Sequence, residues 1–261
     1  MLSLVRLATA AAAPSACRMI LVRHGETNFN ADGRLQGRLE SELTPLGLEQ
    51  ASALGRWFAT IDDSIDRVFV SPRKRTVQTL ANLEEASQLA LPAAQPRRGL
   101  REIELTMWEG QHRSHLRDAE GNDDSERWAR WKARPSSFVF IEDGHAPLQD
   151  LKRRAREEWE ALLLSATAGR TSLVVAHGAF NRVLMLTALG LPVDDFGFHD
   201  DRFAFENCAA VELQWTQGGV LATAWRKRYP SESEWVTREA EVQRRLREEH
   251  AALAGEAKQE L

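Results

Sequence analysis

The segments MILVRHGE, residues 19–26, and SLVVAHGA, residues 172–179, decide the fold of this chain. Each holds a short run of apolar residues, which fits a strand buried on both faces of a sheet. Each run leads, after one further residue, into His-Gly. Because ligands bind at the carboxyl ends of parallel strands, we expect His24 and His177 to face the same crevice.

The chain alternates strands and helices between these two segments and beyond them. Apolar runs predict further strands at 67–70, 208–213 and 220–224, and helical spacing predicts helices after Thr44, Ser71 and His177 and over 150–165. On the helix after Ser71 we expect Val77, Leu80 and Ala81 to point inward. This alternation predicts an α/β fold, a three-layer α/β/α sandwich around a mostly parallel central sheet.

Residues 108–150 interrupt the alternation. They contain the polar run AEGNDDSE at 119–126, the tryptophans Trp128 and Trp131, and then Pro135 and Gly144. The segment is predicted to be an insertion or lid on the domain rather than a separate domain. Core or lid packing is the expected use of its tryptophans.

The two ends of the chain differ in composition from the single domain expected over residues 19–230. Residues 1–18 hold two arginines, several Ser, Thr and Ala, and no acid, which suits an organellar transit peptide; the alternative is a disordered leader. A transit peptide would place the protein in a plastid or mitochondrion, and otherwise we expect it in the cytoplasm. Residues 231–261 are mostly charge and alanine, and predict a helical tail that packs on the domain, joins a homodimer or stays solvated.

Composition excludes several classes of protein. The 261 residues carry a net charge of −4, with a sequence pI near 6.0, which does not favour binding to nucleic acid or an anionic membrane. Two cysteines exclude a disulfide framework, and no apolar run reaches about 18 residues. Phosphate-loop and dinucleotide motifs are absent, and His112 and His115 lack further ligands, so we expect neither cofactor nor metal.

Basic residues surround the two histidines at the expected crevice. Arg23 directly precedes His24, and Arg75 lies near the start of the helix that opens at Ser71, where the helix terminus itself favours an anion. Arginine offers planar, multi-donor binding to phosphate oxygens, and neutral imidazole can attack phosphorus. These residues predict a site for one phosphate group, with a protonated His177 adding to the positive charge.

Five motifs, in this order, resemble those of the histidine phosphatase superfamily, which includes the cofactor-dependent phosphoglycerate mutases. They are LVRHGETNFN at 21–30, LQG and LTPLG within 35–47, SPRKRTVQT at 71–79, LREIELTMWEG at 100–110 and VVAHG at 174–178. The resemblance implies a phosphoglycerate mutase-like fold and a catalytic domain over residues 19–230.

The resemblance also implies a role for each matched position. His24 is implied to be the nucleophile that becomes phosphohistidine. Glu102 is implied to protonate the leaving oxygen and then to activate water, with Glu104 and Glu109 as nearby rivals. The implied phosphate-binding and substrate-binding residues are Arg23, Asn30, Arg34, Gln36, Gly37, Arg75, His177 and Gly178.

One motif departs from the commonest pattern of the superfamily. Asp143-Gly144-His145-Ala146-Pro147 stands where many members have Gly-Glu-Ser. This version, together with Asn207-Cys208, is more similar to a plant and algal subgroup described as 2-carboxyarabinitol-1-phosphatase-like. His145 is expected to be a loop histidine without a catalytic duty.

The expected activity is metal-independent hydrolysis of a small phosphorylated sugar or sugar acid. A phosphoglycerate mutase is the alternative enzyme, although the segment between Glu102 and His177 is short and lacks an evident basic insertion that would clamp a mutase substrate. A third alternative is a silent protein that binds a phosphorylated ligand.

Overall fold

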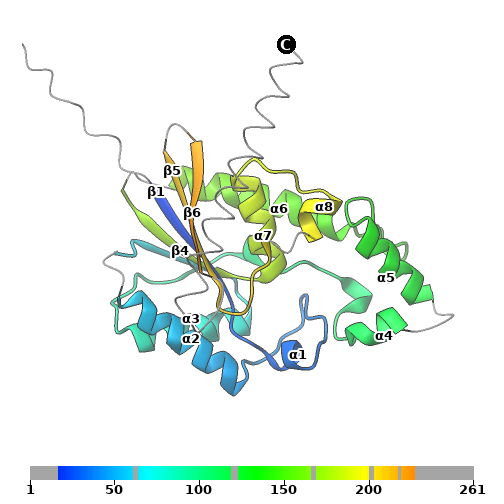
Figure 1. Cartoon of the computed structure of the whole chain (residues 1–261), viewed down its shortest axis with the longest axis horizontal. Helices are drawn as coiled ribbons and strands as arrows, with labels where there is room; N and C mark the ends of the chain where they lie inside the picture. Colours follow the sequence, from blue (N-terminus) through cyan, green and yellow to red (C-terminus); the bar gives the residue numbers. More distant parts are fainter. Residues whose placement is uncertain are drawn as a thin grey trace, which may run out of the picture.

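A six-stranded sheet forms the centre of the molecule. The computed structural model describes residues 17–60, 64–118, 123–165, 169–199, 203–216 and 219–226. The strands are β1 (Cys17–Arg23), β2 (Arg67–Val70), β3 (Gln95–Pro96), β4 (Thr171–Ala176), β5 (Ala210–Thr216) and β6 (Gly219–Arg226). Their order is β3-β2-β4-β1-β5-β6. The first four run parallel to one another, β5 runs antiparallel to β1, and β6 runs antiparallel to β5. The neighbouring strands β4, β1, β5 and β6 are labelled in Figure 1. The prediction of a mostly parallel sheet is confirmed.

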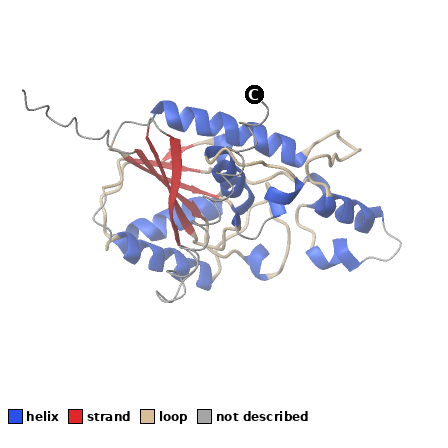
Figure 2. Ribbon diagram, turned by 45° about the horizontal axis from the view of Figure 1, so that its top comes forward, coloured by secondary structure: helices blue, strands red, loops and turns tan. Residues whose placement is uncertain are grey.

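Helices cover both faces of this sheet, as Figure 2 shows. On one face lie α2 (Pro45–Phe58) and α3 (Lys74–Ser87), and on the other lie α6 (Pro147–Ser165) and α7 (Gly178–Ala188). The alternation of side chains along β1 fills both cores, because Ile20 and Val22 pack in the cluster that contains Leu54 and Leu83, whereas Leu21 packs in the opposite cluster. The three-layer sandwich is therefore confirmed.

Helix α3 buries a different face from the one expected. Leu80 is buried, but Val77 is 48% exposed and Ala81 is exposed, so their predicted inward position is wrong. The buried face consists of Arg75, Thr76, Thr79, Leu80, Leu83 and Ser87. Polar side chains take inward positions because this face reaches the cluster of residues around His24 and hydrogen-bonds there.

Residues 108–150 pack onto the same domain through aromatic side chains. The segment contains α4 (Arg113–Asp118) and α5 (Asp123–Ala133), which lie beside the sandwich in Figure 1. Trp108 is fully buried, with ring centroids 5.3 Å from Trp128 and 4.7 Å from Phe140. Trp131 packs 5.6 Å from Phe198 of α8 (Asp195–His199). The insertion is therefore packed against the side of the same domain and does not form a separate one.

The predictions for the chain ends fall mostly outside the described residues. Residues 1–16 and 227–261 are not described, so the leader and the tail stay predictions. Strand β1 already begins at Cys17, two residues before the expected start of the domain, and Arg18 pairs with Glu212 at 2.8 Å. Among the described residues, none of the helices is long and apolar enough to span a membrane.

Candidate active site

The two His-Gly segments meet at the carboxyl edge of the sheet. Strands β1 and β4 are neighbours, with Arg23 in register with Ala176, so the residues that follow them leave the sheet side by side. Both rings are buried, and the ring centroids of His24 and His177 lie 5.4 Å apart. The expectation that the two histidines meet is confirmed.

Local hydrogen bonding sets the tautomer of His24. Its Nδ1 lies 2.8 Å from the carbonyl oxygen of Gly25, which can only accept, so Nδ1 carries the proton and Nε2 keeps its lone pair. Burial, reinforced by the charges of Arg23 and Arg75, holds the pKa of His24 well below its usual value. The ring is thus a neutral imidazole with Nε2 as its nucleophilic atom.

Close backbone contacts hold the turn that follows His24. A Cβ atom on Gly25 would lie 2.5 Å from the carbonyl oxygen of Gly47, and one on Gly47 would lie 2.0 Å from that of Glu26. The Gly25 N–H donates to Thr79 Oγ1 at 3.0 Å. The main chain carrying His24 is therefore fixed between α2 and α3.

His177 is neutral, which contradicts the expected imidazolium. Arg75 Nε donates to His177 Nδ1 at 3.2 Å, so Nδ1 must accept, and His177 Nε2 lies 2.8 Å from Ser71 Oγ. Burial, followed by the charge of Arg75, lowers the pKa of His177 well below its usual value. His177 therefore orients Arg75 rather than adding a charge of its own.

The neutrality of both histidines predicts an acid-sensitive fold. The unfolded chain binds a proton at each near pH 6.5, whereas the folded chain does so only at much lower pH. As the pH falls below about 6.5, we expect the free energy of unfolding to decrease by about 1.4 kcal/mol per pH unit for each histidine. Urea denaturation between about pH 5 and pH 7 measures the slope. His24→Asn and His177→Asn should each remove the contribution of one histidine to this slope. Unchanged slopes in both variants would contradict the neutrality of the two histidines.

Arg75 is fully buried and distributes its guanidinium over three partners. Besides His177, it donates to the carbonyl oxygens of Leu39 at 2.9 Å and Gly37 at 3.0 Å. Burial lowers its pKa to about 10, so it stays charged at neutral pH. These bonds attach the 36–39 loop, with Gln36 and Gly37, to the edge of the site.

Arg23 is half-buried and has donors to spare. Its Nη1 donates to the carbonyl oxygen of Phe205 at 2.6 Å, while its buried Nε has no hydrogen-bond partner among the described residues. Gly178 lies against this guanidinium, because a Cβ atom there would be 3.3 Å from Arg23 Nε. A buried unpaired N–H costs about 1–3 kcal/mol, a penalty that an anionic ligand would remove.

Asn30 is oriented by its side-chain oxygen. Oδ1 accepts hydrogen bonds from the backbone N–H and the hydroxyl of Thr27, at 3.3 and 3.1 Å, and from Asn207 Nδ2 at 3.1 Å. The amide nitrogen of Asn30, which faces no acceptor among the described residues, is thereby left for a ligand. Asn207 also donates to the carbonyl oxygen of His24 at 3.0 Å, and so links the two motif residues. The sequence drew attention to Asn207 only as a subgroup feature.

The carboxylate of Glu102 caps the first turn of α7. It accepts from the backbone N–H groups of Ile103 at 2.8 Å, Phe180 at 3.2 Å and Ala179 at 3.3 Å. Every contact has the carboxylate as acceptor, which suits the ionised form and the positive end of the helix. Glu102 thus lies at the N-terminal end of α7, the helix that begins directly after His177.

The rival carboxylates are engaged elsewhere. Glu104 and Glu109 form ion pairs with Arg38, at 2.7 and 3.2 Å. His145 Nε2 lies 3.0 Å from the carbonyl oxygen of Glu104. None of these three residues is among the described residues that line the cavity containing His24 and Glu102.

A cavity of about 240 Å³ brings the candidate residues together. Its lining includes the expected Arg23, His24, Asn30, Arg34, Gln36, Gly37, Arg75, Glu102 and Gly178. His177 is absent from this lining and lies behind Arg75. The carbonyl oxygen of Gly110 accepts from Arg34 Nε at 2.6 Å.

Two arginines of the lining were not predicted as site residues. Arg182 lies one helical turn after Gly178 on α7, a spacing that could have identified it, and donates to the carbonyl oxygens of Phe203 and Phe198. Arg113 is an exposed residue of α4. No periodic pattern in the 108–150 segment pointed to it.

Comparisons with known proteins agree with this site. The family model described as histidine phosphatase superfamily (branch 1) matches residues 19–228. A probable 2-carboxy-D-arabinitol-1-phosphatase from Arabidopsis thaliana is 36% identical over 183 residues, which cover 69% of this chain and 35% of that protein. A 2-carboxy-D-arabinitol-1-phosphatase from Triticum aestivum is 35% identical over 76% of this chain and 37% of that protein. The chain thus matches little more than a third of the length of these plant relatives.

Other relatives match over most of their length. A probable phosphoglycerate mutase from Klebsiella pneumoniae is 31% identical over 80% of this chain and 89% of that protein. The solved structure of a mycobacterial glucosyl-3-phosphoglycerate phosphatase is 25% identical, with a TM-score of 0.66, and the match covers 82% of this chain and all of that one. The sandwich, the ordered motifs and the matched range lead to one assignment: the chain belongs to the histidine phosphatase superfamily.

Proposed function

We propose that this chain is a metal-independent phosphomonoesterase that hydrolyses a small phosphorylated sugar or sugar acid through a phosphohistidine on His24. The observation that carries the proposal is the state of His24, whose proton is held on Nδ1 by Gly25 while Nε2 is unprotonated. The same cavity contains Arg23, Arg75 and Glu102.

In the first step, His24 Nε2 attacks phosphorus as the bond from phosphorus to the leaving oxygen breaks. The spare donors of Arg23, the charge of Arg75 and the amide nitrogen of Asn30 stabilise the negative oxygens of the transition state. An alkoxide leaves poorly, so protonated Glu102 transfers its proton to the leaving oxygen. The products are an alcohol, a phosphohistidine and a Glu102 carboxylate.

In the second step, the Glu102 carboxylate takes a proton from water as the water oxygen attacks phosphorus. The phosphorus–nitrogen bond breaks, Nε2 regains its lone pair and inorganic phosphate forms. The hydrogen bonds that Glu102 accepts suit this ionised state. The proton gained by Glu102 then serves the next cycle.

The charge of the cavity supports a sugar-acid phosphate in preference to a neutral sugar phosphate. Its described lining holds the arginines Arg23, Arg34, Arg75, Arg113 and Arg182, against the single acid Glu102. A second anionic group on the substrate would use the arginines that do not reach the phosphate. The small volume also favours a metabolite, and the plant relatives are named for the phosphate of a sugar acid.

Arg113 offers a test of this preference. No hydrogen bond or ion pair engages its guanidinium within the described part of the chain, so its charge is available to a ligand. We expect Arg113→Gln to raise KM for 3-phosphoglycerate by about 10-fold, and KM for glycerol 3-phosphate by less than about 2-fold, because only the former carries a carboxylate. Equal changes for the two esters would contradict a second anion site at Arg113.

The proposal is tested with wild-type protein in EDTA, supplied with phosphorylated sugars and sugar acids, including 2-carboxyarabinitol 1-phosphate. Free phosphate and isomer exchange are followed together. Phosphate release that survives EDTA, with an acid-labile and alkali-stable phosphoenzyme, supports the phosphatase. Isomer exchange without phosphate release would instead establish a mutase, and ligand binding without turnover would establish a silent binder.

A further inference from the structure

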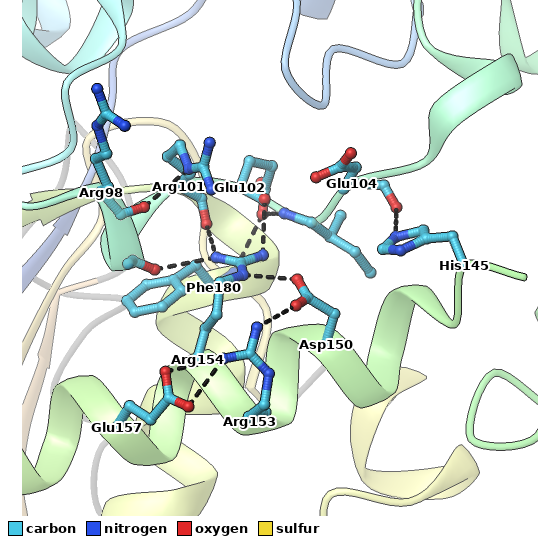
Figure 3. Close-up of polar contacts among 12 residues, drawn as sticks. Arg98, Arg101, Glu102, Glu104, His145, Asp150, Arg153, Arg154, Glu157 and Phe180 are labelled. Carbon is cyan, nitrogen blue, oxygen red and sulfur yellow. Dashed lines mark hydrogen bonds and ion pairs between the residues drawn. The ribbon is translucent and has the colours of Figure 1, made fainter. Parts of the chain in front are cut away.

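We propose that Arg154 of α6 is a positioning residue for Glu102, acting through the main chain of residues 99–102; the inference rests on the proposed role of Glu102. Arg154 does not line the cavity, so it does not touch the substrate. Figure 3 shows its guanidinium directed at the segment that carries Glu102.

One guanidinium binds three carbonyl oxygens of this main chain. Arg154 Nη1 donates to the carbonyl oxygens of Gly99 at 3.0 Å and Arg101 at 2.7 Å, and Nη2 donates to that of Glu102 at 3.1 Å. Among the described residues, these carbonyl oxygens accept no other hydrogen bond. The segment that presents Glu102 therefore depends on Arg154 for its backbone acceptors.

Arg154 is itself held in place. Its side chain is only 8% exposed, and its Nε donates to Asp150 Oδ2 at 2.7 Å, one helical turn earlier on α6. Asp150 supplies the countercharge that a nearly buried guanidinium requires. A second contact joins α6 to the same segment, because Glu158 forms an ion pair with Arg97. The Glu158 side chain also lies so close to Gly99 that it leaves no space for a Cβ atom there.

Glu102 is thus fixed from two helices at once. Arg154 of α6 holds its main-chain carbonyl, while the N–H groups of Ala179 and Phe180 at the start of α7 hold its carboxylate. The neighbouring α6 and α7 pack against each other on one face of the sheet. Loss of Arg154 removes the first support and leaves the second, so the acid would remain in the site but lose its alignment with the leaving oxygen. Displacements of about 1 Å can cost a reaction about 100-fold.

This role predicts a dependence on the leaving group. An alkyl ester needs the proton of Glu102, whereas p-nitrophenyl phosphate releases a phenolate that leaves without one. In Arg154→Gln we expect kcat/KM for 3-phosphoglycerate to fall about 10- to 100-fold and kcat/KM for p-nitrophenyl phosphate to stay within about 3-fold. Because kcat/KM reports steps up to phosphoenzyme formation, it isolates the acid role. Inhibition by orthovanadate should change by less than about 2-fold, since the phosphate site is intact.

The chain contains a matched control one residue away. Arg153 also bonds to Asp150, at 2.6 Å, but its other partner is Glu157 and it makes no bond to residues 99–102 (Figure 3). Arg153→Gln should therefore leave both substrates unaffected. Arg154→Lys keeps the charge but cannot reach all the carbonyl oxygens, so it should show the same selectivity at intermediate size. If Arg154→Gln does not fold, the Arg154→Lys variant tests the positioning role in its place.

Distinct results separate the two proposals. Equal losses on both substrates, or wild-type selectivity in Arg154→Gln and Arg154→Lys, would overturn positioning while leaving the phosphatase intact. Absence of selectivity in Glu102→Gln would overturn the acid role and, with it, this inference. No phosphate release by the wild type on any ester would overturn the proposed function itself.

Discussion

Replacement of His24 by alanine is expected to reduce phosphate release by at least about 10⁴-fold. Among the described residues of the cavity lining, His24 is the sole imidazole, since His177 lies behind Arg75 with Nδ1 engaged by that arginine. The arginines that we propose to bind phosphate remain in the variant. Binding of phosphate should consequently persist while turnover disappears.

The measurement is steady-state phosphate release together with acid-labile, alkali-stable labelling from a ³²P ester. His145→Ala is the matched control, because His145 bonds to the carbonyl oxygen of Glu104 and does not line the cavity. It should keep turnover and labelling. Alkali-stable label in His24→Ala would place the phosphoenzyme on another residue and contradict the nucleophile assignment.

Glu102→Gln is expected to lower kcat/KM for alkyl phosphate esters by about 10²- to 10⁴-fold. Glutamine keeps the shape of the side chain and its oxygen can still accept from Ile103 and Phe180, but it transfers no proton. The loss of kcat/KM should therefore be much smaller for p-nitrophenyl phosphate, and binding of inorganic phosphate should change little. Hydrolysis of the phosphoenzyme should also slow, because the variant cannot activate water.

Rapid mixing with p-nitrophenyl phosphate measures both effects, since a slow second step appears as a burst of nitrophenolate equal to the enzyme concentration. Glu104→Gln is the control, because Glu104 pairs with Arg38 outside the cavity lining. A Glu102→Gln variant that loses only phosphate binding, with unchanged turnover at saturation, would refute the acid–base role.

The sequence could predict the elements whose patterns are local. Apolar runs located five of the six strands but not the two-residue β3, whose Gln95 and Pro96 form no apolar run. The two His-Gly pairs indicated which strand ends meet. The inward face of α3 escaped prediction because hydrogen bonds to distant residues, such as that between Thr79 and Gly25, outweigh hydrophobicity there. The charge of His177 was misjudged for a related reason. Its protonation depends on the buried donor of Arg75, which lies 102 positions away in the chain.

Contacts from irregular segments could not be predicted either. Arg113 reaches the cavity from the short α4, which is held to the core by the buried Leu116 and shows no repeating pattern. Arg154 lies on a helix that was correctly predicted over 150–165, but nothing in its spacing shows that its guanidinium bonds to residues 99–102. Such interactions emerge only when distant segments come together.

The contact between Gly25 and Gly47 restricts how this site can evolve. The atoms that a new Cβ would strike are main-chain carbonyl groups of Gly47 and Glu26. A second substitution can shrink a neighbouring side chain, but it cannot shorten a peptide group. Variants at either glycine should therefore have no suppressor mutation among the contacting residues. Descendants that acquire new substrates must change other parts of the site, while the contact between Gly25 and Gly47 is inherited unchanged.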